Sequence, residues 1–97
     1  GLRAPMVGHL GDGNFHVLLP YNPEKKETYE KIRKFSDILI EKTLELEGTI
    51  TGEHGVGLHK KEYLKKEHAD NLPTMKLIKR TMDPNNIMNP GKIFDLN

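Results

Sequence analysis

The chain contains no cysteine and no tryptophan, and aromatic residues make up only 6% of its 97 residues. Without cysteine it can form no disulfide, thiolate metal site or iron–sulfur cluster, and it has no thiol nucleophile. Any metal must therefore be bound by nitrogen and oxygen ligands. Long apolar runs are also missing, because no segment approaches the roughly 18 residues that a membrane-spanning helix requires.

A strong excess of charge of either sign is absent as well. Fifteen basic residues against fourteen acidic ones give a formal net charge of +1. A nucleic-acid-binding domain would show a basic excess or a clustered basic face, so we expect no nucleic-acid partner. The length allows one small domain with a thin apolar core. The chain has no initiator methionine, and we expect it to be the C-terminal piece of a longer protein.

Periodicity and turn residues predict the first half of the chain. Residues 15–19 form an apolar run after the turn-forming residues 11–14, which predicts a strand. A long amphipathic helix should follow, since Asn22 can cap it, Pro23 suits its first position and apolar residues recur at helical spacing. Gly48 is expected to end this helix in a left-handed conformation, and residues 48–51 to form a short strand.

The second half should contain two further helices. Residues 60–68 are dense in lysine and glutamate, whereas residues 73–82 have an apolar face through Met75, Ile78 and Met82. Residues 89–94 combine turn chemistry with a short apolar anchor. Together the elements predict an α+β fold with an antiparallel sheet.

Two glycine-rich segments concentrate side chains that can bind metal. The segment GHLGDGNFH contains His9 and His16, and the segment TGEHGVG contains Glu53 beside His54. Glycine lets the backbone approach closely and adopt positive φ, so such loops can gather ligands around a small group. Two imidazoles and a carboxylate are a known ligand set for zinc and similar divalent ions.

Simpler explanations exist for each residue taken singly. A lone histidine in a glycine-rich loop is more often a surface hydrogen-bonding residue, and glycines alone can reflect tight turns. His59 and His68 lie among lysines and glutamates, and we expect both to be solvated. The histidine pair together with the Glu–His pair favours a site, because separate coincidences would otherwise be required.

Three ordered segments resemble the C-terminal region of the FAD-linked oxidases: GHLGDGNFH, TGEHGVGLHK and MKLIKRTMDPNNIMNPGKIF. This family includes cytochrome-type D-lactate dehydrogenase, the glycolate oxidase flavin subunit and D-2-hydroxyglutarate dehydrogenase. The resemblance covers almost the whole chain and looks closest to the D-lactate branch. It implies a ferredoxin-like antiparallel sheet covered by helices, as part of a two-domain flavoenzyme. Residues 1–97 would be the C-terminal part of the substrate (cap) domain, with residues 84–97 returning toward an upstream FAD-binding domain.

The resemblance also implies roles for individual residues. It makes His9, His16 and Glu53 ligands of a divalent metal, Zn or Mn, and it makes His54 the catalytic base. Asn14 and Lys60 match family positions near this site.

One position departs from part of the family. Leu18 stands where the hydroxyglutarate enzymes carry a substrate-contacting asparagine, which favours a small 2-hydroxy acid as substrate.

Further expectations concern cofactor, partners and location. The implied cofactor is FAD, bound mainly by the upstream domain, and the implied reaction oxidises a small 2-hydroxy acid to a 2-oxo acid. We also expect an electron acceptor, which the sequence does not identify. Pairing of two copies through open strand edges is expected as well. The expected location is cytoplasmic, with membrane association through the electron acceptor, or mitochondrial in a eukaryote. The isolated chain should be inactive; the alternative is a stand-alone, non-catalytic metal-binding or interaction module.

Overall fold

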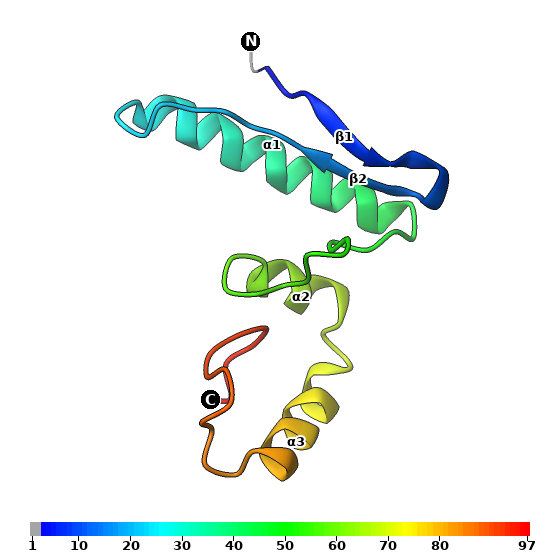
Figure 1. Cartoon of the computed structure of the whole chain (residues 1–97), viewed down its shortest axis with the longest axis vertical. Helices are drawn as coiled ribbons and strands as arrows, with labels where there is room; N and C mark the ends of the chain where they lie inside the picture. Colours follow the sequence, from blue (N-terminus) through cyan, green and yellow to red (C-terminus); the bar gives the residue numbers. More distant parts are fainter. Residues whose placement is uncertain (1–2) are drawn as a thin grey trace. The chain divides into compact units, whose positions relative to one another are not determined.

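The computed structural model describes residues 3–97, which form six elements of secondary structure (Figure 1). They are β1 (Met6–His9), the 3-10 turn η1 (Leu10–Asp12), β2 (Asn14–Val17), α1 (Lys26–Glu45), α2 (Lys61–Glu67) and α3 (Leu72–Met82). Two compact units are present: the first ends at Gly48 and the second runs from Thr49 to Asn97. The predicted α+β class with an antiparallel sheet is confirmed. None of the helices in residues 3–97 is long and apolar enough to cross a membrane.

Strands β1 and β2 form an antiparallel hairpin. The register pairs Met6 with Val17 at one end and His9 with Asn14 beside the turn. Gly13 closes the turn, since its φ is 73° and its N–H donates to the Leu10 carbonyl at 3.0 Å. The predicted strand is confirmed, although it begins at Asn14 and ends at Val17, a little before its expected end.

Gly8 allows the two strands to approach closely. A Cβ atom at this position would lie 2.5 Å from the Asn14 carbonyl oxygen and 2.6 Å from the Phe15 Cα. Both neighbours are backbone atoms that cannot rotate away, so any side chain at residue 8 would force the strands apart. The glycine is therefore a requirement of the hairpin and not only of its turn.

Helix α1 begins at Lys26, later than Asn22 and Pro23 predicted. The Asn22 side chain accepts a hydrogen bond from the Glu24 N–H at 3.0 Å, which closes a local turn instead of capping a helix. This side-chain preference for a turn explains why the predicted start is wrong.

The face of α1 that carries apolar residues is partly covered. Half-buried positions recur at helical spacing through Thr28, Ile32, Phe35, Leu39 and Thr43. Both figures draw β2 alongside this helix within the first unit. The predicted amphipathic helix over a sheet is therefore confirmed.

The end of α1 corrects the expected role of Gly48. The left-handed residue is Glu47, whose φ is 60°, and the helix itself ends at Glu45. Gly48 is needed for space, because a Cβ there would lie 2.8 Å from the Thr43 Cγ2 and 3.1 Å from the Thr43 carbonyl oxygen. Its N–H donates to that carbonyl at 2.9 Å.

Residues 48–51 do not form the expected strand. Ile50 is 4% exposed, and its backbone groups bond to side chains in place of a neighbouring strand. The Ile50 N–H donates to Glu67 Oε2 at 3.1 Å, and the Ile50 carbonyl accepts from Lys60 Nζ at 3.3 Å. With both groups satisfied in this way, the segment has no need of strand pairing.

The two predicted C-terminal helices are present within one residue of their expected bounds. Pro73 lies in the first turn of α3, where its missing N–H costs no helical hydrogen bond. The apolar face is less covered than its periodicity suggests: Met75 is half-buried, whereas Ile78 and Met82 are 58% and 75% exposed.

Asp83 closes α3 and organises the segment after it. Its buried carboxylate accepts the N–H groups of Ile87 and Met88, each at 3.0 Å, and pairs with Lys79. The hydrogen bond from Lys79 lowers the pKa of Asp83 most; burial opposes this effect, and the two backbone donors add to it. The chain then returns toward the start of the unit, where the Ile93 N–H donates to the Gly57 carbonyl at 2.8 Å.

Candidate functional site

The hairpin register places three candidate residues on one face. His9 lies opposite Asn14, and His16 lies two residues beyond Asn14 on the same strand. Side chains two residues apart on a strand, and those directly opposite across a pair, share a face. His9 is exposed, whereas Asn14 and His16 are half-buried. Two imidazoles and an amide are thus neighbours at the turn end of the hairpin.

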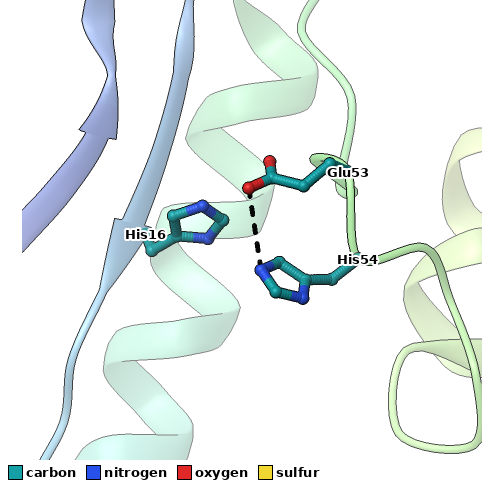
Figure 2. A group of neighbouring side chains, drawn as sticks. All are labelled: His16, Glu53 and His54. Atoms are coloured by element: carbon teal, nitrogen blue, oxygen red, sulfur yellow. Dashed lines mark ion pairs between the residues drawn. The ribbon is translucent and has the colours of Figure 1, made fainter.

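Glu53 and His54 are adjacent on a loop of the second unit. Glu53 Oε1 lies 3.7 Å from His54 Nε2, and the two side chains are 52% and 72% exposed, respectively (Figure 2). The same figure draws His16 on β2. The separation exceeds that of a direct hydrogen bond, and both groups are accessible to a ligand.

Glycines give this loop its shape. Gly55 and Gly57 have φ values of 72° and 54°, in the left-handed region that residues with a Cβ atom rarely adopt. No atom lies within 4 Å of a Cβ built at either position, so their requirement is conformational. A weak turn bond from the Gly55 N–H to the Gly52 carbonyl, at 3.4 Å, closes the segment that carries Glu53 and His54.

Lys60 lies at the base of this loop. It is half-buried, and its Nζ donates to the Ile50 carbonyl at 3.3 Å. Glu67, which the sequence did not single out, accepts a hydrogen bond from the N–H of Ile50. The only signal for Glu67 was its place in a lysine- and glutamate-rich helix, which did not separate it from the solvated glutamates around it.

The other residues singled out from the sequence lie at the margins of these two groups. Leu18 directly follows β2 and is 51% exposed. His59 is exposed, as expected. The His68 side chain is 40% exposed, and its Nε2 lies 3.4 Å from Glu67 Oε1.

Residues 1–93 match the family described as FAD linked oxidases, C-terminal domain. The chain belongs to this family. The membership inferred from the three sequence segments is confirmed. The family match, unlike any single motif, extends over β1, the loop with Glu53 and His54, and the C-terminal tail.

Several curated relatives are similar over nearly the whole chain. The identity is 44% to the mitochondrial D-lactate dehydrogenase [cytochrome] of Arabidopsis thaliana, covering 96% of this chain and 17% of the relative. It is 44% to glycolate oxidase subunit GlcD of Bacillus subtilis, with coverages of 90% and 19%. It is 41% to the D-2-hydroxyglutarate dehydrogenase of Stutzerimonas stutzeri, again with 90% and 19%. The chain therefore spans less than a fifth of the length of each of these relatives.

Proposed function

We propose that this chain is the C-terminal part of the substrate domain of an FAD-dependent dehydrogenase that oxidises a small 2-hydroxy acid, of the D-lactate or glycolate type, to a 2-oxo acid. Residues 84–97 would return toward the FAD-binding domain. Family membership and the names of the relatives support this class of reaction. The observation that carries the proposal is the hairpin register, which puts His9, Asn14 and His16 on one face.

The proposed metal ligands are His9, His16 and Glu53. Imidazole nitrogens and a carboxylate oxygen suit Zn or Mn, and three protein ligands leave coordination positions open for a substrate. His9 and Glu53 are exposed and His16 is half-buried, so each side chain is accessible to an ion. A divalent cation would supply Lewis-acid polarisation of the substrate oxygens.

His54 is the proposed general base. Its imidazole would take the proton of the 2-hydroxyl group, since histidine is the side chain that most often serves as a general base. Glu53 Oε1 lies 3.7 Å from the Nε2 atom of that ring. As the O–H bond breaks, the C2–H bond breaks too and the C=O bond forms; FAD would supply the acceptor for the hydride.

Two residues near the hairpin bear on substrate choice. The amide of Asn14 can hydrogen-bond a substrate oxygen from the same face as the two histidines. Leu18 offers no donor to a second carboxylate, which favours a small monocarboxylate over a dicarboxylate. A panel of D-lactate, glycolate and D-2-hydroxyglutarate, assayed on the full-length protein, separates these classes by kcat/KM.

The base assignment is tested with His54→Asn in the full-length protein. We expect flavin reduction by D-lactate to slow by about 100- to 10,000-fold, the range for loss of a general base, with FAD still bound by its visible absorbance. The matched control is His59→Asn, an exposed histidine five residues further along. Reduction at the full rate in His54→Asn would refute the role of His54.

The metal assignment needs a separate measurement. Elemental analysis of the active protein should find Zn or Mn, and His9→Ala or His16→Ala should each lower the bound amount, unlike His59→Ala. Active protein without either metal would refute the ligand set. Metal binding without flavin reduction by any 2-hydroxy acid would instead favour a non-catalytic metal-binding module.

A further inference from the structure

Ile50 is held by an unusual pair of contacts. The whole residue is only 4% exposed, so water cannot readily satisfy its backbone groups. Instead the carboxylate of Glu67 accepts its N–H at 3.1 Å, and the ammonium of Lys60 donates to its carbonyl at 3.3 Å. A buried backbone group that loses its partner is costly, so both side chains are needed to keep Ile50 in this position.

Both partners come from the same side of α2. Lys60 is the N-cap residue and Glu67 the last helical residue, so seven positions, nearly two turns, separate them. Leu64, four positions after Lys60, lies on the same side and is 5% exposed. One face of α2 thus carries the cation and the anion that bond to Ile50, with a buried leucine between them.

The charges of this pair run against the helix dipole. Helix N-termini favour anions and C-termini favour cations. The exposed residues of α2 follow this rule, with Glu62 in the first turn and Lys65 in the last. Lys60 and Glu67 reverse it, so helix stability does not explain their placement.

The two side-chain contacts with Ile50 adjoin the loop proposed to act in catalysis. Ile50 directly precedes residues 51–57, which carry Glu53 and His54. At the far end of the loop, the Lys60 N–H donates to the Val56 carbonyl at 3.3 Å. Glu67 is itself held, because its second oxygen lies 3.4 Å from His68 Nε2 and its side chain is only 12% exposed.

We propose that Lys60 and Glu67 are positioning residues that fix residues 51–57 by clamping the two backbone polar groups of Ile50. The ammonium of Lys60 acts on the protein backbone, and not on the substrate. This inference rests on the proposed function of Glu53 and His54.

The test uses Glu67→Ala and Lys60→Met in the full-length protein, each compared with a conservative partner. Glu67→Gln retains a carbonyl acceptor for the Ile50 N–H, and Lys60→Arg retains a donor for its carbonyl. Glu62→Ala and Lys65→Met are the matched controls, since this exposed pair on α2 forms a 2.7 Å surface contact. The readouts are the Kd for Zn²⁺ or Mn²⁺ without substrate, amide hydrogen exchange of residues 51–57, and the separate kcat and KM for D-lactate.

We expect Glu67→Ala and Lys60→Met to weaken metal binding by about 10- to 100-fold, the range for lost outer-shell contacts. Exchange of residues 51–57 should accelerate and kcat should fall more than KM rises. The conservative variants and the controls should remain close to wild type. Unchanged metal affinity and unchanged exchange in both truncating variants would overturn the clamp. A raised KM with unchanged metal affinity would overturn it too, because Lys60 would then contact the substrate.

Two further outcomes are informative. If Glu67→Ala accelerates exchange throughout residues 49–97, unfolding of the unit hides any effect on the loop. The clamp is then judged from Lys60→Met, which keeps an aliphatic side chain of similar length. If the wild-type protein neither binds metal nor reduces flavin, the proposed function fails. Hydrogen exchange of residues 51–57 in the same variants still supports or overturns the clamp.

Discussion

Different kinds of contact stabilise the interior of each of the two units. In residues 3–48 no side chain reaches full burial, and the contacts are mainly the hairpin ladder and the hydrogen bonds of α1. Residues 49–97 contain the buried side chains Ile50, Leu64 and Asp83. The second unit also has side-chain contacts between residues far apart in the chain, such as the Lys61–Asp95 ion pair at 2.7 Å.

Exposed apolar side chains occur in both units, among them Met6 and Val7 of the hairpin, at 68% and 53%, and Met82 of α3, at 75%. Because neighbours on a strand point to opposite faces, Met6 and Val7 lie on different faces of the hairpin and form no single patch. The second unit orders its loops by itself, through charged side chains that bond to the backbone. Local contacts thus build the hairpin, whereas long-range polar contacts build the loop with Glu53 and His54.

The largest expected loss of stability confined to one unit comes from Leu64→Ala. Removing this buried side chain should destabilise the second unit by about 2–5 kcal/mol, the usual range for a buried leucine. Hydrogen exchange of the full-length protein should show faster exchange in residues 49–97 and little change in residues 6–17. Leu77→Ala, at a position 63% exposed, is the control. Equal acceleration in both units would mean that they unfold as one.

A smaller destabilisation, in the first unit instead of the second, is expected from Gly8→Ala. The added methyl group meets backbone atoms of β2, so the hairpin should lose about 1–3 kcal/mol, as in overpacked sites. Exchange in residues 6–17 should accelerate while that of residues 61–67 stays unchanged. Gly11→Ala is the control, because a methyl group at residue 11 would have no atom within 4 Å. Unaltered protection of the hairpin would show that the strands can separate without cost.

The pH dependence of the second unit should be the smallest of the three effects. The pKa of Asp83 is lowered in the folded state from its ordinary 3.8, chiefly by the hydrogen bond from Lys79. Its contribution to stability is therefore present above about pH 4 and is lost as the pH falls through the lower, folded-state pKa. The Tm advantage of the wild type over Asp83→Asn should shrink below this pH.

Glu27 provides the comparison in the first unit. Its pKa is also lowered by a lysine, Lys31, but the Glu27 side chain is 81% exposed. Solvent screens such a pair, so Glu27→Gln should leave the Tm unchanged between pH 3 and 7. A Tm advantage over Glu27→Gln as large as that over Asp83→Asn would contradict the distinction between the units.

Features that depend on neighbouring residues could be predicted from the sequence. Periodicity identified α1 and α3, and the glycine-rich turn identified the hairpin, because both signals act over a few residues. The start of α1 could not be predicted, since Asn22 can equally cap a helix or close a turn. The role of Gly48 was hidden as well, because it depends on the position of Thr43.

For the candidate site, residue types were predictable but supporting contacts were not. His9 and His16 were paired from their spacing across a turn, and the register places them on one face. The strand expected at residues 48–51 is absent because Lys60 and Glu67 replace its hydrogen bonds from 10 and 17 residues away. Nothing in the local sequence distinguishes these two residues from the solvated lysines and glutamates beside them.

The bond from Ile93 to the carbonyl of Gly57 also sets an order of events during synthesis. At about 5–20 residues per second, a ribosome makes Ile93 roughly two to seven seconds after Gly57. Throughout that interval the segment with Glu53 and His54 is already made but its bond to Ile93 cannot form. The loop therefore gains this bond only once Ile93 has been made, and a nascent chain that stalls earlier carries the segment without it.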